Sequence, residues 1–219
     1  MKSDSKLLVK VLGYYIFYED ETWVVELYME MIKCNLREFI YEPKYESESD
    51  IHFSLNKNIN LLIRFLLEAN IFLEKQGYVH VDLAPRNIGV TWENQFVLLD
   101  LDSLLPLGIE TFYGGSGFSY FEAPEFKKLV SENNLFFSTQ KFLKGSLFSK
   151  GAIILQVIYM KSEETSRNVC SDFLDILEKK IKITDPSLYK ILDNMLMKDP
   201  EDREDILTLY NEHFLPFFG

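Results

Sequence analysis

Residues 79–103, VHVDLAPRNIGVTWENQFVLLDLDS, contain the most informative pattern in this 219-residue chain. An apolar strand leads into a loop that begins with His80 and Asp82 and ends with Asn87. A second apolar strand then delivers Asp100, 18 residues after Asp82. Phosphoryl transfer from ATP uses such a set: one carboxylate orients the acceptor hydroxyl and takes its proton, while an Asn and a second carboxylate hold Mg²⁺ on the phosphates. The stretch therefore predicts a phosphoryl-transfer site.

The order and spacing of these residues resemble those of the protein-kinase superfamily. Residues 80–87, HVDLAPRN, resemble the catalytic loop H-R-D-L-x-x-x-N, and residues 100–102, DLD, stand where D-F-G is found. Residues 123–125, APE, resemble the motif that closes the activation segment. Further along, residues 147–151 resemble the start of the central buried helix, and residues 195–206 resemble the terminal helical motif.

This resemblance implies an α+β, protein-kinase-like fold, with a mainly helical C-lobe and a truncated β-strand remnant of the N-lobe. Residues 1–31 would form the remnant hairpin and hinge, and residues 32–219 would form the C-lobe. Within the C-lobe, the catalytic loop would span 80–87 and the activation segment 100–125. The family pattern also implies that Arg203 pairs with Glu125.

The resemblance assigns a role to each matching polar residue. Asp82 and Arg86 would be the catalytic residues, with Asp82 as the base. Asn87, Asp100 and Asp102 would bind Mg²⁺, and Asn87 would also contact the nucleotide. Asp100 and Asp102 stand two apart at a strand end and would therefore point to the same side. Two other interpretations stay open: Asp82 as a loop carboxylate that caps backbone N–H groups, and Asp102 as a turn residue.

The nucleotide base would bind at the end of the hairpin. Met29 matches the gatekeeper position, and Glu30, Met31 and Ile32 match the hinge whose backbone meets adenine. His80 is interpreted as a packed, hydrogen-bonded strut rather than as a catalyst.

Several family elements are missing or altered. The Gly-rich strand pair, the strand with the ATP-binding Lys and the helix with its Glu partner do not fit into the eight residues before Val9. Lys10 follows a V-A-I-K-like strand, but no helix with a Glu follows it before the next strand, which argues against a catalytic Lys. The glycines of residues 115–119 precede APE and are interpreted as a substrate loop rather than a phosphate loop.

Three substitutions within the motifs also depart from the family. Val81 replaces the Arg that clamps an activation-loop phosphate. Ala84 replaces the Lys that serine/threonine kinases carry near the transferred phosphate. Ser146 replaces the Asp with which the central helix braces the catalytic loop.

The function is therefore open between different classes. The first hypothesis is a divergent protein-kinase-like domain, with ATP/Mg²⁺-dependent phosphoryl transfer to protein hydroxyls by lineage and weak or absent autonomous activity. The second is a pseudokinase that serves as a scaffold or binding module. The third is a partial gene model of a complete kinase.

Composition restricts the partners and the compartment. A net charge of −11 and a pI near 4.8 argue against a nucleic-acid partner, because binding to phosphates relies on clustered Lys and Arg. No apolar stretch reaches the roughly 18 residues of a membrane span, and the N-terminus lacks a signal-peptide pattern. With only two cysteines, Cys34 and Cys170, we expect a cytoplasmic protein. The expected partner is a protein substrate, a protein partner or a second chain that completes the N-lobe.

Periodicity and turn residues predict the secondary structure. Residues 7–31 form a hairpin that turns near Glu19–Glu21, and Gly77 ends a long helix. Short strands are expected over 77–81, 87–91 and 95–101, and helices over 35–41, 56–76, 147–160, 168–181, 187–197 and 203–214. His52 and His213 are expected on the surface. The tail, residues 213–219, is interpreted as a packing terminus, with a cover for a partner groove as the alternative.

Overall fold

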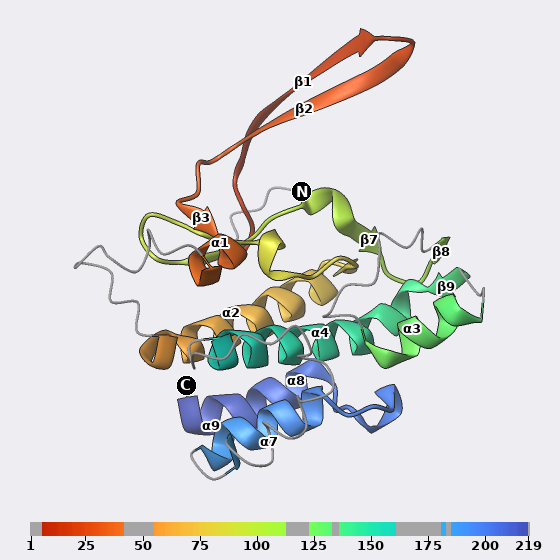
Figure 1. The fold of residues 1–219 in the computed structure, drawn as a ribbon. Helices are drawn as coiled ribbons and strands as arrows, with labels where there is room; N and C mark the ends of the chain where they lie inside the picture. The colour runs from red at the N-terminus through yellow and green to blue at the C-terminus, as the bar shows by residue number, and fades with distance from the viewer. Residues whose placement is uncertain are drawn as a thin grey trace.

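The computed structural model describes residues 6–41, 55–112, 123–132, 136–160, 181–182 and 185–218. Within these ranges the chain combines small antiparallel sheets with several helices, so it is an α+β protein. Figure 1 shows one long hairpin that extends away from a body in which the long helices lie below most of the short strands.

The hairpin consists of β1 (Val11–Glu19) and β2 (Thr22–Met29). The two strands pair from Val11 opposite Met29 to Glu19 opposite Thr22, with an irregularity between Val11 and Gly13. Asp20 and Glu21 form the turn with φ angles of 47° and 63°. Two positive φ angles match the right-handed twist of the strands, which is why two-residue hairpin turns adopt them. The predicted hairpin and its turn are confirmed.

The short strands hold the loops of the predicted site. β5 (Ile88–Val90) lies between β3 (Cys34–Asn35) and β6 (Phe96–Leu98), while β4 (Tyr78–His80) pairs with β7 (Leu104–Pro106). The segment before the hairpin joins this body, because Leu8 bridges Leu98 in parallel. A further pair, β8 (Glu110–Phe112) with β9 (Phe136–Ser138), lies near α3 (Pro124–Ser131) (Figure 1).

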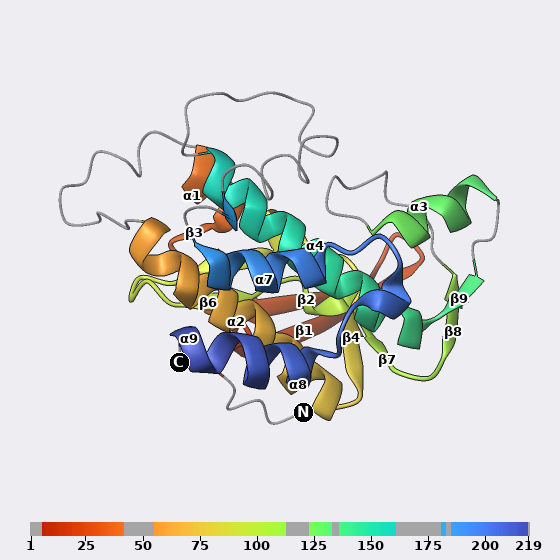
Figure 2. The ribbon, with the colours of Figure 1, turned by 90° about the horizontal axis from the view of Figure 1, so that it is seen from below.

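Two long helices form the centre of the body. α2 (Leu55–Lys75) and α4 (Thr139–Met160) pack against each other, and α4 also packs against α7 (Pro186–Met195) (Figure 2). Their contact buries apolar side chains completely, including Leu62, Ile63, Leu66, Ile153 and Ile154. No helix among the described residues has the length and apolar character that a bilayer crossing requires.

The predicted helices differ from the structure mainly at their ends. α2 matches its expected range, and Gly77 follows it with a φ of 79°. Residue 35 belongs to β3, so α1 (Leu36–Tyr41) begins one residue later than expected. α4 begins at Thr139 rather than at 147, because Phe142 in its first turns stacks on Phe126 with ring centroids 4.6 Å apart. The sequence does not indicate that the helix begins before residue 147, because Gly145 and Ser146 are weak helix formers.

The C-terminal helix is more complex than expected. It begins at Ile206 rather than at 203, because the Asp205 carboxylate accepts a hydrogen bond from the Thr208 backbone N–H at 2.9 Å. A short α8 (Ile206–Thr208) continues as a π-helix over Leu209–Phe214 and ends as α9 (Leu215–Phe218). The expected helix over 168–181 lies almost entirely outside the described residues, as do His52 and residues 115–119.

His213 is not a surface residue, so that prediction is wrong. Its side chain is buried within the π-helix, and its Nε2 lies 2.8 Å from the Glu204 Oε2. Its neighbour Phe214 is fully buried and stacks on Phe218, which supports the prediction that the tail packs against the body.

Candidate active site

The catalytic-loop residues are held by a short helical turn. After β4 ends at His80, Pro85–Asn87 form a 3-10 turn, and β5 follows directly. Proline suits the first position of such a turn, because its fixed φ is helical and it has no N–H to leave unpaired. The Asn87 Nδ2 donates to the Asp82 carbonyl oxygen at 2.7 Å and lies 3.2 Å from the Asp82 Oδ2. The loop therefore folds back so that Asn87 holds both the backbone and the carboxylate of Asp82.

Asp100 enters the same group from the other strand. The Asn87 Nδ2 lies 3.3 Å from the Asp100 Oδ2, so one amide group connects the carboxylates of Asp82 and Asp100. Asp100 has a φ of 57°, in the left-handed region. Non-glycine residues rarely adopt this conformation, and strained backbone of this kind clusters at functional sites.

The expected strand-end geometry for Asp100 and Asp102 is wrong. β6 ends at Leu98, and residues 101–103 form a 3-10 turn rather than more strand. The left-handed Asp100 starts this turn, and the Ser103 Oγ donates to the Asp100 Oδ2 at 2.6 Å. The turn, rather than strand alternation, brings Asp102 to Asp100. Ser103 was missed in the sequence, where a Ser three residues after an Asp is the available signal.

The two acidic side chains of this turn share a hydrogen bond, which affects them in opposite directions. Burial and the neighbouring Asp102 raise the pKa of Asp100, and Asp82 adds to this effect. The hydrogen bond from Asp100 lowers the pKa of Asp102. Adjacent carboxylates disfavour simultaneous ionisation, so the pKa of one rises while the pKa of its hydrogen-bonded partner falls.

The third carboxylate of the group, that of Asp82, forms an ion pair with Arg86. Its Nη2 lies 2.5 Å from the Asp82 Oδ2, and both side chains are partly exposed to solvent. The structure therefore brings together Asp82, Arg86, Asn87, Asp100 and Asp102, which are all the predicted catalytic and metal-binding residues.

The His80 ring packs against the catalytic loop. The prediction that His80 is a packed, hydrogen-bonded strut is confirmed. Its Nε2 lies 3.2 Å from the Leu99 carbonyl oxygen, and its Nδ1 accepts from the Asp82 backbone N–H at 3.3 Å. Because Nδ1 is an acceptor, the ring proton resides on Nε2 and is donated to Leu99. Burial lowers the pKa of His80 to about 4, so the ring is neutral at pH 7.

The predicted hinge residues lie at the base of the hairpin and are held by a separate set of contacts. The Glu30 backbone N–H donates to the Lys10 carbonyl oxygen at 2.9 Å, and the Glu30 Oε1 accepts from the Lys10 N–H at 2.8 Å. Met31 is 77% exposed. Ile32 lies beside Gly89, where an added Cβ would stand 3.3 Å from the Ile32 Cγ2.

The acidic residues fit Mg²⁺ better than a metal bound by protein alone. Among the described residues, no group of three or more His, Cys, Asp or Glu side chains forms a metal-binding cluster. Mg²⁺ commonly binds one or two carboxylates and takes its remaining ligands from water and substrate phosphates. Asp100 and the side-chain oxygen of Asn87 are suitable oxygen ligands of this kind.

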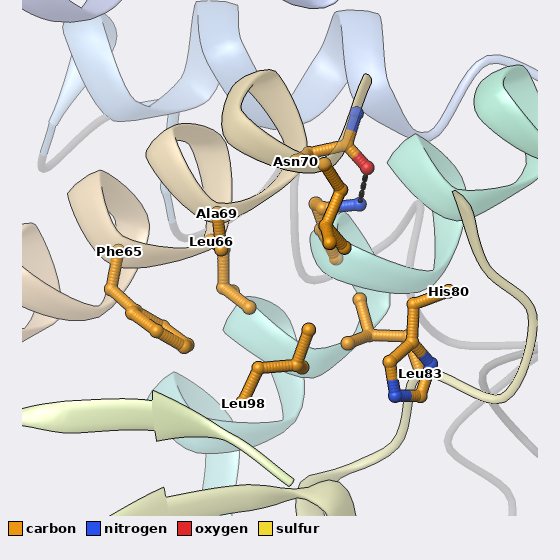
Figure 3. A pocket seen from close by; sticks show the side chains of 9 residues that line it. Phe65, Leu66, Ala69, Asn70, His80, Leu83 and Leu98 are labelled. Carbon is orange, nitrogen blue, oxygen red and sulfur yellow. Dashed lines mark hydrogen bonds between the residues drawn. The ribbon is translucent and has the colours of Figure 1, made fainter. Parts of the chain in front are cut away.

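A buried polar cluster lies next to the loop and was also missed in the sequence. Figure 3 shows a pocket between α2 and the catalytic loop, lined by Asn70 and His80 among apolar side chains. Lys150 of α4 also lines it, and its Nζ donates to the Asn70 Oδ1 at 2.8 Å (Figure 3) and to the Ser146 Oγ at 3.1 Å. Burial lowers the pKa of Lys150 to about 7. Ser146 thus takes part in a cluster with a lysine.

The pairing of Arg203 with Glu125 is confirmed. Two hydrogen bonds join the guanidinium to the carboxylate, at 2.6 Å and 2.9 Å. The Arg203 side chain also donates to the carbonyl oxygens of Met197 and Lys144. The pair connects the start of α3 to the segment before α8.

Comparison with known proteins gives a distant relationship. No protein-family model matches the chain. A serine/threonine-protein kinase of Caenorhabditis elegans is 24% identical over 186 residues, which cover 83% of this chain and 18% of that protein. The chain therefore spans less than one fifth of the length of this relative. The match suggests a kinase-like relationship.

Proposed function

We propose that this chain is a divergent protein-kinase-like domain, whose site descends from ATP- and Mg²⁺-dependent phosphoryl transfer to protein hydroxyls. The observation that supports it is the position of the Asn87 amide, which lies 3.2 Å from the Asp82 Oδ2 and 3.3 Å from the Asp100 Oδ2. The loop that carries Asp82 and Asn87 thus lies beside Asp100, so a candidate base and a candidate metal ligand stand side by side. The distant kinase relative supports the same lineage.

In this proposal each side chain has a defined task. Asp82 orients the acceptor hydroxyl and takes its proton. Arg86 and Asn87 hold the Asp82 carboxylate, and His80 positions the Asp82 backbone. Asp100 and Asn87, with Asp102 beside them, hold Mg²⁺, which supplies charge neutralisation on the phosphates. The backbone of Glu30, Met31 and Ile32 receives the nucleotide base.

We expect weak or absent activity from the isolated chain. Neither a Gly-rich loop nor a lysine strand followed by a Glu-bearing helix is present in the sequence before the hairpin. Removing one electrostatic donor from a transition state costs about 10²–10³ in rate, so losing several leaves little catalysis. Asp82 is also neutralised by Arg86 and has to leave this ion pair to act as a base.

The alternative is a pseudokinase that binds or scaffolds a protein partner. The ion pair between Asp82 and Arg86 favours it, because a carboxylate held in this way stabilises the loop without any chemistry. A partial gene model is a further alternative, since the chain spans 18% of its kinase relative.

Calorimetric titration with ATP, in the presence and absence of Mg²⁺, tests the nucleotide site. We expect binding that requires Mg²⁺ and that Asp100→Asn abolishes. Asp20→Asn is a matched control, because Asp20 also has a left-handed backbone, with a φ of 47° against 57° at Asp100, but lies in the hairpin turn. Lack of binding by the unmodified chain at millimolar ATP would contradict the proposed site.

Phosphotransfer to a generic protein substrate then separates the two main hypotheses. Slow incorporation that Asp82→Asn removes would support the enzyme. ATP binding without incorporation would favour the pseudokinase.

A further inference from the structure

Lys150 is buried in the centre of the body and uses all of its hydrogen-bond donors. Only 3% of the residue is exposed, and its Nζ lies 2.8 Å from the Asn70 Oδ1, 3.2 Å from the Ser146 carbonyl oxygen and 3.1 Å from the Ser146 Oγ. A lysine ammonium has three N–H donors, so each of them has an acceptor here. Buried polar networks that are fully satisfied in this way rigidify the groups that they connect. The cluster therefore fixes Asn70 of α2 against α4.

The cluster does not stabilise the fold as an ion pair would. None of the three acceptors is a carboxylate, and burial lowers the pKa of Lys150 to about 7, with Glu74 acting in the opposite direction. A charge that is buried without a hydrogen-bonded counter-charge lowers stability. Residues that break such a rule are expected at functional sites. The position of Lys150 beside the catalytic loop gives this expectation a physical basis.

The other side of this cluster faces the catalytic loop. Asn70 and Lys150 line the same pocket as two side chains of the loop, His80 and Leu83 (Figure 3). His80 and Leu83 stand on either side of Asp82 in the chain and are only 5% and 9% exposed. The His80 Nδ1 accepts a hydrogen bond from the Asp82 backbone N–H at 3.3 Å. Movement of Asn70 would therefore change the pocket that holds the loop on both sides of Asp82.

We propose that Lys150 is a positioning residue of the catalytic loop. Its hydrogen bonds to Asn70 and Ser146 keep one wall of the pocket in place. The His80 ring, which lines the same pocket, then stays where its Nδ1 holds the Asp82 backbone N–H. This inference rests on the proposed function only where it treats Asp82 as the base.

Ser146 does not replace Lys150 in this role. Its hydroxyl has a single proton, and two acceptors lie within reach, the Asn70 Oδ1 at 3.1 Å and the Leu143 carbonyl oxygen at 2.9 Å. Loss of the Lys150 amine should therefore loosen Asn70 and, through the pocket, the Asp82 N–H. The same change removes a buried charge and should make the whole fold more stable at pH 7. A lysine without a positioning role would change the loop and the rest of the fold in the same direction.

Hydrogen exchange of single backbone amides at pH 7, followed by NMR, tests this opposite response. In Lys150→Met, which removes the amine but keeps an unbranched side chain, the Asp82 amide should exchange at least about tenfold faster. The Tyr189 amide, which donates to the Asp185 carbonyl oxygen at 2.9 Å, is the reference and should exchange no faster. Lys141→Met is the matched control, because it makes the same substitution at an exposed position of α4, and it should change neither amide.

Ser146→Ala is a second variant, and it should fold because alanine is the better helix former. It leaves the hydrogen bond from Lys150 to Asn70, so it should accelerate exchange of the Asp82 amide by a smaller factor. The nitrogen NMR signals of the His80 ring give an independent signature. The chain has three histidines, and His80→Gln identifies these signals. We expect one neutral tautomer, with the proton on Nε2, in the unmodified chain and a mixture of both tautomers in Lys150→Met.

Two results would overturn the proposal: exchange of the Asp82 amide that neither Lys150→Met nor Ser146→Ala changes, or equal responses of the Asp82 and Tyr189 amides. Phosphotransfer tests the proposed function separately. Where the unmodified chain transfers phosphate, Lys150→Met should lower kcat and leave the KM for ATP unchanged, because Asp82 does not hold the nucleotide. A chain that transfers no phosphate would remove the role of Asp82 as a base, whereas the exchange rates would still decide whether Lys150 positions the loop.

Discussion

Arg203 and Glu125 lie 78 residues apart in the sequence and form a two-point ion pair, with Nη1–Oε1 at 2.6 Å and Nη2–Oε2 at 2.9 Å. The Arg203 side chain is fully buried, whereas 17% of the Glu125 side chain is exposed. The central guanidinium carbon of Arg203, Cζ, lies 5.3 Å from the centre of the Phe148 ring. Phe148 belongs to α4, so this contact connects the ion pair to that helix. The pair therefore joins α3, α4 and the segment before α8.

Removal of the Glu125 carboxylate should leave the buried Arg203 guanidinium without its counter-charge. We expect Glu125→Ala to lower the free energy of unfolding by about 3–5 kcal/mol, the usual cost of breaking a buried pair from one side. Urea denaturation measures it. Glu132→Ala, at an exposed position just after α3, is the control and should change stability by less than about 0.5 kcal/mol. Equal effects of both substitutions would show that the pair is not structural.

His80 should make stability depend on pH between 4 and 6.5. The unfolded chain protonates this imidazole below its ordinary pKa of 6.5, whereas burial holds the folded pKa at about 4. Between these values the unfolded state binds more protons, so stability falls as pH falls. The loss amounts to about 3 kcal/mol when it is complete. Urea midpoints of the unmodified chain and of His80→Gln, measured from pH 7 to pH 4, should differ by less at the acid end. A constant difference would contradict the neutral ring.

Lys150 should make stability depend on pH in the alkaline range, and stability should again rise with pH. Its folded pKa is about 7, against an ordinary value of 10.5, because burial disfavours the charged form. Between these values the unfolded state again binds more protons, so stability rises from pH 7 to pH 10. The methionine of Lys150→Met does not titrate. The free energy of unfolding of this variant should therefore exceed that of the unmodified chain most at pH 7 and least at pH 10. Ser146 still donates to Asn70 in this variant, which keeps the Asn70 oxygen paired.

Lys150→Arg provides the control for this measurement. A guanidinium stays charged from pH 7 to pH 10, so residue 150 should give this variant, like Lys150→Met, no pH dependence in that range, and Lys150→Arg should be less stable than Lys150→Met by the same amount at both pH values. If the stability of the unmodified chain changes with pH no more than that of these two variants, the lysine does not lose its proton in the folded state.

Gly145 should be intolerant of any side chain. A Cβ built at this position overlaps the ring of Phe126, which is stacked on Phe142 at 4.6 Å. We expect Gly145→Ala to cost about 1–3 kcal/mol by overpacking between α3 and α4. Gly13→Ala is the matched control, since no atom lies within 4 Å of its added Cβ. Thermal or urea unfolding should also show that Phe126→Leu recovers part of the loss in the double variant, because the two sites are in contact.

Local features of the site could be predicted from the sequence. The Pro-containing loop between two short strands, the helix that ends at Gly77 and the hairpin turn at Asp20 and Glu21 all follow from residues close together in the chain. Periodicity and turn chemistry describe such neighbours directly. The Glu125 and Arg203 pair was also predicted, although only through the family resemblance, since residues 78 apart give no local signal.

The group around Asp100 shows where this reasoning fails. Strand alternation placed Asp100 and Asp102 on one side, whereas a left-handed Asp100 and a 3-10 turn bring them together. The left-handed conformation is unfavourable for an isolated Asp, and hydrogen bonds from Ser103 and from the distant Asn87 accompany it here. The contact with Asn87 forms only when the two strands come together in the folded chain, so strand alternation in the sequence does not predict it.

The spacing of the sequence determined which groups can meet at the site, because the loop and the two strands that carry Asp82, Asn87 and Asp100 are short-range structures. The tertiary structure alone decided the burial of Lys150 and His213, since Lys150 is paired with Asn70, 80 residues away, and His213 lies beside Glu204 within a π-helix. It also decided that large side chains of the hairpin such as Tyr14 and Trp23 are exposed among the described residues, because exposure depends on everything that packs nearby. Local hydrogen bonding can be predicted from neighbours, whereas burial and the pKa shifts that it causes depend on the whole fold.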